Sequence, residues 1–243
     1  MNINFNDIEN RINLEHSINS AINLIKNNNN QSLNFFWLGK CAYNPTWILQ
    51  KKLHELRVNN EINDTILLLE HEHVYTLGKN ADENHILPSK PENTEVVRID
   101  RGGDVTYHGP GQLVGYPIIN LNNYRKSITW YMNLLSDSII DLLSDMNIKG
   151  YYKKDYIGVW VDEEKIAAFG VRLAKWTTMH GFALNINTNL DYFEGMIPCG
   201  IFQYGVTSIN KITNKKFEIS EIARKYSNYF IKHLNKKVEY ETS

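Results

Sequence analysis

Apolar positions recur with the spacing of helices in three segments of the chain. One helix is predicted to begin after Ser127, a favourable N-cap residue, because apolar residues then recur every three or four positions: Ile128, Tyr131, Leu135, Ile139, Leu142 and Met146. A second is predicted after Asn44-Pro45, which would supply an N-cap and a first-turn proline, and would end near Val58. A third is expected over 219–234, with an apolar face made of Ile222, Tyr226, Phe230 and Leu234.

Seven shorter apolar runs predict strands, several of them next to turn residues. They cover residues 33–38, 65–69, 95–99, 113–119, 157–161, 165–173 and 179–187. The run at 65–69 is almost entirely apolar, as in a strand that is buried on both faces of a sheet. Because helices and strands mix without strict alternation, their order predicts an α/β fold with a mixed sheet, and neither a repeat protein nor a doubly wound fold.

Residues 1–32 differ in composition from the rest of the chain. They are rich in asparagine and end in a polar tract, and their isoleucines, at near-helical spacing, allow only a weak amphipathic helix. We therefore expect this segment to be a mobile extension outside the fold. Residues 33–243 contain no linker and no repeat, so we expect them to form a single domain.

Composition and charge narrow the classes of function. The chain has 26 Lys and Arg against 27 Asp and Glu, a formal charge of −1, so we expect neither a nucleic-acid binder nor a membrane-surface protein. No apolar run approaches the ~20 residues of a membrane-spanning helix. Cys41 and Cys199 are too few and too far apart for a disulfide scaffold or a Cys-rich metal site. His71 and His73 lack the spacing and the further ligands of a zinc motif, so we expect no metal.

Two segments combine polar or reactive side chains with glycine and proline residues. Residues 101–112, RGGDVTYHGPGQ, hold four glycines and a proline, which is more than a hairpin turn needs, and we expect this loop to contact a ligand. Pro198 and Gly200 flank Cys199 and would fix its thiol on a tight loop, where it could act as a nucleophile. The alternative is a buried structural thiol, which suits Cys41 better.

A third segment joins a cation to small side chains. Lys165 leads a strand that contains two alanines and Gly170, and a partly desolvated lysine is suited to proton transfer. The sequence His180-Gly181-Phe182-Ala183 again sets small residues beside a polar one. Considered singly, an exposed lysine at a strand end and a structural histidine would be the simpler interpretations.

Together these segments resemble the octanoyltransferases of lipoate synthesis, the lipoyl(octanoyl) transferases. Four blocks match in order: residues 65–78, which end in VYTLG; the loop at 101–112; KIAAFGVR at 165–172 followed by HGFALN at 180–185; and PCGI at 198–201 with GVTS at 205–208. The resemblance covers about residues 33–209, and its second block is long and specific.

The resemblance implies that 33–243 is a catalytic domain similar to that of biotin and lipoate protein ligases, which moves an octanoyl group without metal, ATP or other cofactor. Cys199 would carry the acyl group as a thioester, and Lys165 would be its acid/base partner. Phe169 and Phe182 stand where the family has smaller residues, and would narrow the acyl pocket slightly. The residues expected to bind substrate are Arg101, Gly102, Gly103, Asp104, Val105, Thr106, Tyr107, His108, Ala168, Phe169, Gly170, Gly181, Phe182 and Ala183.

The implied partners are octanoyl-acyl carrier protein and the lipoyl domains of 2-oxoacid dehydrogenases and of the glycine cleavage H protein. We expect a monomer, in the cytoplasm of a bacterium or in the mitochondrial matrix or plastid of a eukaryote. Because the carrier protein is acidic and this chain is nearly neutral, a local basic patch should steer it. The candidates are Lys51, Lys52 and Arg57, or Lys153 and Lys154.

Three alternatives stay open. An ATP-dependent lipoate or biotin ligase would activate a free acid and would need no cysteine. A lipoyl amidotransferase would use a cysteine, but such enzymes lack the K-I-A-A and P-C-G arrangement found here. A binding protein without activity would be expected to lack Cys199 or Lys165, and both are present.

Overall fold

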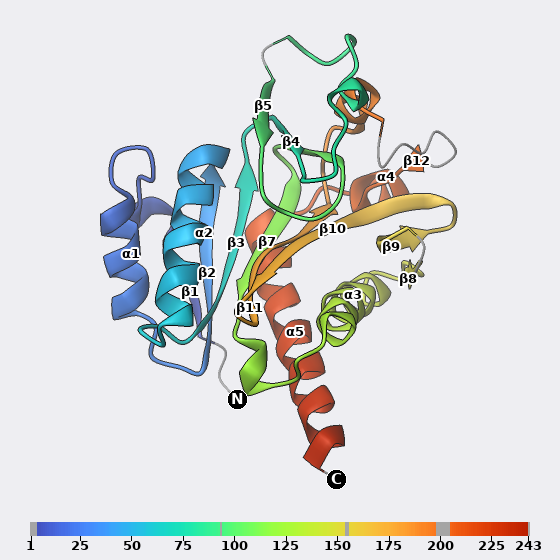
Figure 1. Ribbon diagram of the computed structural model, residues 1–243. Helices are drawn as coiled ribbons and strands as arrows, with labels where there is room; N and C mark the ends of the chain where they lie inside the picture. Colours follow the sequence, from blue (N-terminus) through green and yellow to red (C-terminus); the bar gives the residue numbers. More distant parts are fainter. Residues whose placement is uncertain (1–3, 93, 154–155, 198–204, 243) are drawn as a thin grey trace.

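A mixed sheet with helices on both faces forms the body of the protein (Figure 1). The computed structural model describes residues 4–92, 94–153, 156–197 and 205–242. Among these residues the main sheet has nine strands, with β12 (Gly205–Val206) beside β10 and the others in this spatial order: β1 (Phe5–Asp7), β2 (Leu33–Cys41), β3 (Asp64–His71), β7 (Gln112–Ile118), β11 (Thr177–Asn185), β10 (Glu164–Ala174), β9 (Gly158–Val161) and β8 (Tyr151–Tyr152).

A second, smaller sheet lies against one end of the main sheet (Figure 1). In the described part of the chain it has three strands, β5 (Glu95–Arg98), β4 (Val74–Leu77) and β6 (Val105–His108). The glycine-rich loop leads into β6 and continues from it into β7, so it passes from the small sheet to the centre of the main one. The predicted α/β class with a mixed sheet is therefore confirmed.

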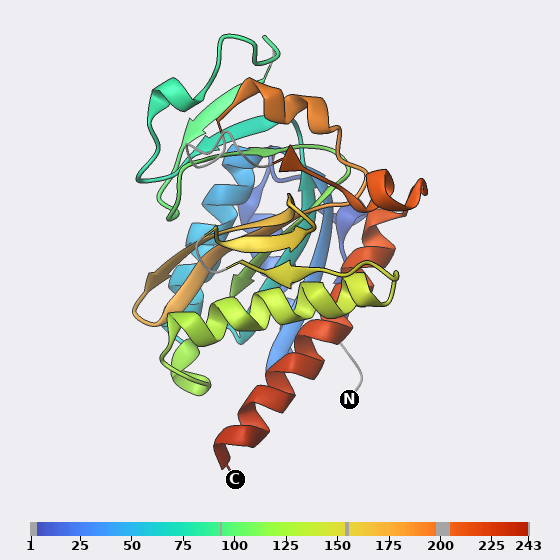
Figure 2. The same ribbon diagram turned by 90° about the vertical axis from the view of Figure 1, so that its right-hand side faces the viewer.

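The helices form two layers, which Figure 2 shows from the side of α3 and α5. One layer has α1 (Ile18–Asn27) and α2 (Tyr43–Val58), and the other has α3 (Ile128–Ser144) and α5 (Ile219–Thr242), with the short α4 (Ile209–Thr213) leading into α5. Short 3-10 helices η1 to η4 cover Glu9–Arg11, Glu83–His85, Leu121–Asn123 and Leu190–Gly195. No helix in the described ranges is both long and apolar enough to cross a membrane.

The three predicted helices are present, and their starts have identifiable causes. Ser127 caps α3 as predicted, because its hydroxyl accepts a hydrogen bond from the backbone N–H of Trp130. The N-cap predicted at Asn44 is wrong: α2 begins at Tyr43, after Ala42, and Asn44 instead donates to Glu95. The apolar faces of α3 and α5 are buried, except that Ile128 of α3 is half exposed.

The expectation that residues 1–32 lie outside the fold is wrong for the part of them that the structure describes. Strand β1 pairs in parallel with β2, with Phe5 opposite Phe35, and so covers an edge that would otherwise be open. Ala21 and Ile25 of α1 are fully buried and pack in the same cluster as Leu53 of α2. The isoleucine spacing thus produces a docked amphipathic helix, because α2 offers it an apolar surface.

Candidate active site

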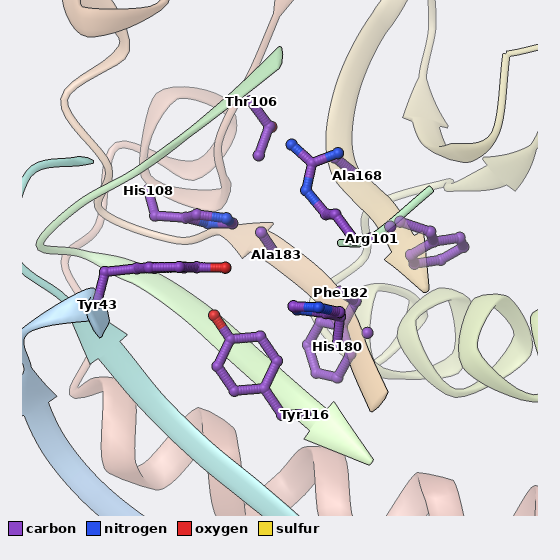
Figure 3. A pocket seen from close by; sticks show the side chains of 12 residues that line it. Tyr43, Arg101, Thr106, His108, Tyr116, Ala168, His180, Phe182 and Ala183 are labelled. Carbon is purple, nitrogen blue, oxygen red and sulfur yellow. The ribbon is translucent and has the colours of Figure 1, made fainter. Parts of the chain in front are cut away.

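A pocket lies where the glycine-rich loop and β6 cover the main sheet (Figure 3). The empty space within it and at its mouth is about 360 Å³, a figure that includes open solvent. Its lining comes from α2, the loop, β6, β7, β10 and β11: Tyr43, Arg101, Thr106, His108, Tyr116, Ala168, Phe169, Gly170, His180, Gly181, Phe182 and Ala183. Nine of these residues are among those expected from the sequence, and Tyr43, Tyr116 and His180 are additional.

Small residues in adjacent strands form the floor of the pocket. Ala168 of β10 pairs with Ala183 of β11, and Gly170 pairs with Gly181. Their neighbours in sequence carry the bulk, because alternate side chains of a strand point to opposite faces. The ring of Phe182 packs against Tyr226 of α5, with 4.5 Å between ring centroids.

The two phenylalanines therefore do not narrow the pocket as expected. Phe182 belongs to the hydrophobic cluster between the sheet and the α3/α5 layer, and Phe169 packs against that same cluster. Gly115 of β7 accommodates the Phe182 ring, since a β-carbon at Gly115 would collide with it. The floor stays flat because the aromatic bulk is on the other face of the sheet.

Arg101 forms part of the roof (Figure 3). It is buried, and its Nη2 donates to the carbonyl oxygen of Thr76 at 2.9 Å and to the Thr76 hydroxyl at 3.0 Å. Gly170 lets the arginine lie close to β10, because a β-carbon there would be 2.7 Å from Arg101 Cδ. Gly103 adopts a positive φ of 91° at the turn that follows the arginine.

Five of the expected loop residues do not line the pocket but shape the loop. Gly102 donates its N–H to the carbonyl of Val171 at 3.0 Å, which ties the loop to β10. Asp104 pairs with His85 at 2.6 Å. Val105 and Tyr107 pack in a small separate cluster, and Gly103 makes the turn.

Neutral histidines and tyrosines lie on the α2 side of the pocket, where Tyr43, His108 and Tyr116 line it and His71 contacts Tyr116. His71 Nδ1 donates to the carbonyl of Cys41 at 2.8 Å, so its Nε2 accepts from the Tyr116 hydroxyl at 2.7 Å. Burial lowers the pKa of His71 to about 4 and lowers the pKa of His108 well below its usual range. The His108 ring stacks on Tyr43, as Figure 3 shows. Both nitrogens of His71 are thus used in protein hydrogen bonds, as a structural histidine requires.

His180 is the least expected part of the lining. Its ring is buried, and its Nε2 donates to Asp100 Oδ1 at 2.9 Å, while the other oxygen of Asp100 accepts from Arg172 at 2.6 Å. The hydrogen bond from His180 is the largest cause that lowers the pKa of Asp100 to about 2, so the carboxylate is ionised. Burial lowers the pKa of His180 despite this carboxylate, so the ring is neutral near pH 7.

Lys165 does not line the pocket, but its side chain extends toward the Ala168 end of it. It is half-buried at the start of β10, and its Nζ lies 5.1 Å from the centroid of the Trp160 ring. A β-bulge follows it, so Ile166 and Ala167 both face the helix-side core. Its side chain extends toward Gly158, the residue that pairs with Ala168, because Lys165 Cδ and Cε lie 3.4 Å from the β-carbon position of Gly158.

The predicted nucleophile Cys199, with Pro198 and Gly200, lies outside the described residues. Strand β12 follows this segment closely and pairs with the start of β10, with Val206 opposite Lys165. The other cysteine, Cys41, is a buried free thiol whose pKa burial raises to about 12, which suits the structural role expected from the sequence. Within the described ranges, three or more His, Cys, Asp or Glu side chains nowhere gather as metal ligands would.

Comparison with known sequences places this site in a family. A model of the lipoyl protein ligase A/B catalytic domain matches residues 42–231. An octanoyltransferase of Caldicellulosiruptor saccharolyticus is 46% identical over 204 residues, which are 82% of this chain and 87% of the relative. An octanoyltransferase of Christiangramia forsetii is 39% identical over 225 residues, 84% of this chain and 96% of the relative.

Solved structures share the fold at much lower identity. A bi-partite lipoate protein ligase from Thermoplasma acidophilum superposes with a TM-score of 0.62 at 13% identity, over 81% of this chain and 82% of that one. Biotin protein ligase from Aquifex aeolicus superposes with a TM-score of 0.51 at 17% identity, over 84% and 70%. The predicted similarity to the catalytic domains of lipoate and biotin ligases is confirmed for the fold.

Proposed function

Because the chain belongs to the lipoyl protein ligase A/B catalytic domain family, we propose that it transfers an octanoyl group from octanoyl-acyl carrier protein to a specific lysine of lipoyl domains. It is an acyltransferase of protein lipoylation, like the octanoyltransferases that it resembles at 39–46% identity. The observation that carries the proposal is the pair of small side chains Ala168 and Ala183 on the pocket floor, which begins near Lys165 and leaves room for an unbranched acyl chain.

In the first half-reaction, the thiolate of Cys199 attacks the thioester carbonyl of the donor. The C–S bond to the carrier's thiol breaks, the octanoyl–Cys199 thioester forms, and the Lys165 ammonium gives its proton to the departing thiolate. A thiolate is the reactive form of cysteine, and a neighbouring ammonium stabilises it. Burial of Lys165 against Trp160 strengthens that electrostatic interaction, since less water screens it.

In the second half-reaction, the neutral amine of the acceptor lysine attacks the octanoyl–Cys199 thioester. An amide bond forms, the C–S bond breaks, and Lys165, now neutral, accepts the proton that the amine loses. Cys199 leaves as a thiolate and is ready for the next donor. Splitting the transfer lets two protein substrates use one site in turn, and predicts ping-pong kinetics.

The alternative is an ATP-dependent ligase, because ligases share this fold. At 13–17% identity that likeness supports the fold alone. The much closer octanoyltransferases, together with the K-I-A-A and P-C-G segments, favour transfer through a cysteine.

The proposed partners are the acidic carrier protein and the lipoyl domains of 2-oxoacid dehydrogenases and of the glycine cleavage H protein, met by a monomer in a bacterial cytoplasm. Of the basic residues considered for docking, Arg57 is excluded, because it is buried and pairs with Asp64 at 2.6 Å. Lys51 and Lys52 of α2 are exposed, so the proposed docking patch lies there. Replacing both with Glu should raise the KM for the carrier severalfold; an unchanged KM contradicts this patch.

The proposed transfer is tested with purified chain, octanoyl-acyl carrier protein and a lipoyl domain. Intact-mass measurement should show the domain heavier by one octanoyl group without ATP, and no change when its acceptor lysine is replaced by Arg. A parallel mixture receives free octanoate and ATP instead of the carrier. Product in the ATP mixture only would replace the proposal with the ligase alternative.

A further inference from the structure

His180 is held in the pocket wall at a cost that packing alone does not explain. Its φ is +57°, a left-handed value, and the other described non-glycine residues with positive φ lie at turns or helix ends, not inside a strand. Its ring is buried, yet Nδ1 has no hydrogen-bond partner. Both features cost free energy, and such costs concentrate where a residue serves function.

The left-handed backbone decides which face of the sheet the ring occupies. In a regular strand, His180 would share a face with Phe182 and Leu184, which pack on the α3/α5 side. Instead its ring meets Tyr116 edge-on at 6.3 Å, and its backbone N–H donates to Gln50 of α2. The strain therefore brings the imidazole into the pocket, where Figure 3 shows it beside Tyr116.

The distance from Lys165 to this ring matches the length of an acyl chain. The Lys165 side chain reaches the level of Ala168, and His180 pairs with Val171, three residues further along β10. Three residues of a strand span about 10 Å. Each carbon–carbon bond of an extended alkyl chain advances about 1.25 Å, so the seven carbon–carbon bonds of an octanoyl group span about 9 Å.

We propose that His180, braced by Asp100, is the end wall that limits the length of the acyl chain in this pocket. The inference rests on the acyl transfer proposed above. The reacting carbonyl lies beside Lys165, the chain runs over Ala168 and along the Arg101 side chain that covers Gly170, and its methyl end meets the imidazole. A longer chain must displace the ring, which Asp100 and its partner Arg172 hold in place.

The test is the chain length that the enzyme prefers. The wild type is mixed with equal amounts of octanoyl- and decanoyl-acyl carrier protein, and the acyl-enzymes are separated by intact mass. In His180→Asn the wall is shortened, and Asn tolerates a left-handed backbone. The ratio of decanoyl- to octanoyl-enzyme should rise at least tenfold, since a methylene in an apolar pocket changes selectivity by about 10- to 200-fold.

Two further variants make the result decisive. His54→Asn is the matched control, because His54 lies on α2, bonds the carbonyl of Thr177 and does not line the pocket; its ratio should equal that of the wild type. Asp100→Ala removes the brace at a partly exposed position and should raise the ratio by a smaller factor; it decides the matter if His180→Asn does not fold.

An unchanged ratio in folded His180→Asn, or in Asp100→Ala where His180→Asn does not fold, overturns the end wall and leaves the transfer intact. A wild type that acquires no acyl group from either carrier overturns the proposed function instead, so the two failures are distinguishable.

Discussion

The two faces of the main sheet are built from the same strands but have different contents. On the side of α3 and α5, Phe182 and Leu184 of β11 join a cluster of large buried side chains that includes Phe35 and Phe230. On the pocket side, β10 and β11 contribute alanine and glycine, and the larger neighbours are histidines and tyrosines. Each face carries a buried apolar cluster, and the face covered by α2 also leaves space for a substrate.

The period of two along a strand makes this division possible, because each strand supplies both faces. Where β10 and β11 have small residues in the pocket, their neighbours in sequence are large side chains that pack on the α3/α5 side. The small residues of the pocket therefore need not weaken the sheet. We therefore expect substitutions on the α3/α5 face to change stability and not acyl-chain selectivity, and substitutions in the pocket lining of β10 and β11 to change acyl transfer more than stability.

The largest expected effect on stability is on the helix face. Phe230 of α5 is fully buried and meets Phe35 edge-on, with centroids 6.1 Å apart. Phe230→Ala should lower the free energy of unfolding by about 3–5 kcal/mol through lost burial and a residual cavity. Urea denaturation measures this loss. The decanoyl-to-octanoyl ratio of the folded variant should not change, and a changed ratio would break the division between the faces.

The second effect comes from the neutral histidine beside the pocket. Because the pKa of His71 falls from its ordinary value of 6.5 to about 4 in the folded state, only the unfolded chain binds a proton between these values. Stability is therefore fully present above pH 6.5 and is lost as the pH falls toward 4, by roughly 3 kcal/mol for this residue. His108, whose pKa is also lowered, adds a loss of the same sign.

Urea midpoints between pH 7 and 5 check this expectation. The wild type should lose stability as the pH falls, and His71→Gln should flatten the slope by about 1 kcal/mol per pH unit averaged over this range. A slope that is equal in both proteins would mean that His71 is not held neutral.

The smallest effect on stability is expected on the pocket floor. Ala168 is partly exposed in β10, and valine is favoured in strands, so Ala168→Val should change the free energy of unfolding by less than about 0.5 kcal/mol. The added methyl groups narrow the floor, and octanoyl-enzyme should form at least tenfold more slowly. Gly170 is less suitable for this test, because a side chain there would push against Arg101. An unchanged rate in Ala168→Val would mean that the acyl chain does not cross this floor.

Most of the fold was predictable because its elements are marked locally. The spacing of apolar residues within α3 and within α5 is enough to predict each helix, and Ser127 marks the start of α3. Residues 1–32 were misjudged because their stability comes from partners: β1 needs the edge of β2, and α1 needs α2. The composition of residues 1–32 contains no information about the edge of β2 or the apolar surface of α2, on which their folding depends.

The pocket residues also fall into two groups, those that the sequence identified and those that it did not. The loop residues Arg101, Thr106 and His108 could be identified from a dense local pattern, and they line the pocket. Tyr43 and Tyr116 carry no such pattern, because only the packing of α2 and β7 brings them there. His180 faces the pocket through a single left-handed residue inside a strand, which alternation of side chains cannot foresee.

The proposed mechanism depends on Cys199 as the residue that carries the acyl group, with Lys165 as its acid/base partner. The most direct measurement is intact-mass spectrometry after mixing with octanoyl-acyl carrier protein without ATP, for wild type, Cys199→Ala and the matched control Cys41→Ala. We expect one octanoyl group, labile to hydroxylamine, on the wild type and on Cys41→Ala, and none on Cys199→Ala. An adduct that persists in Cys199→Ala, or no adduct on the wild type, would rule out Cys199 as the acyl carrier.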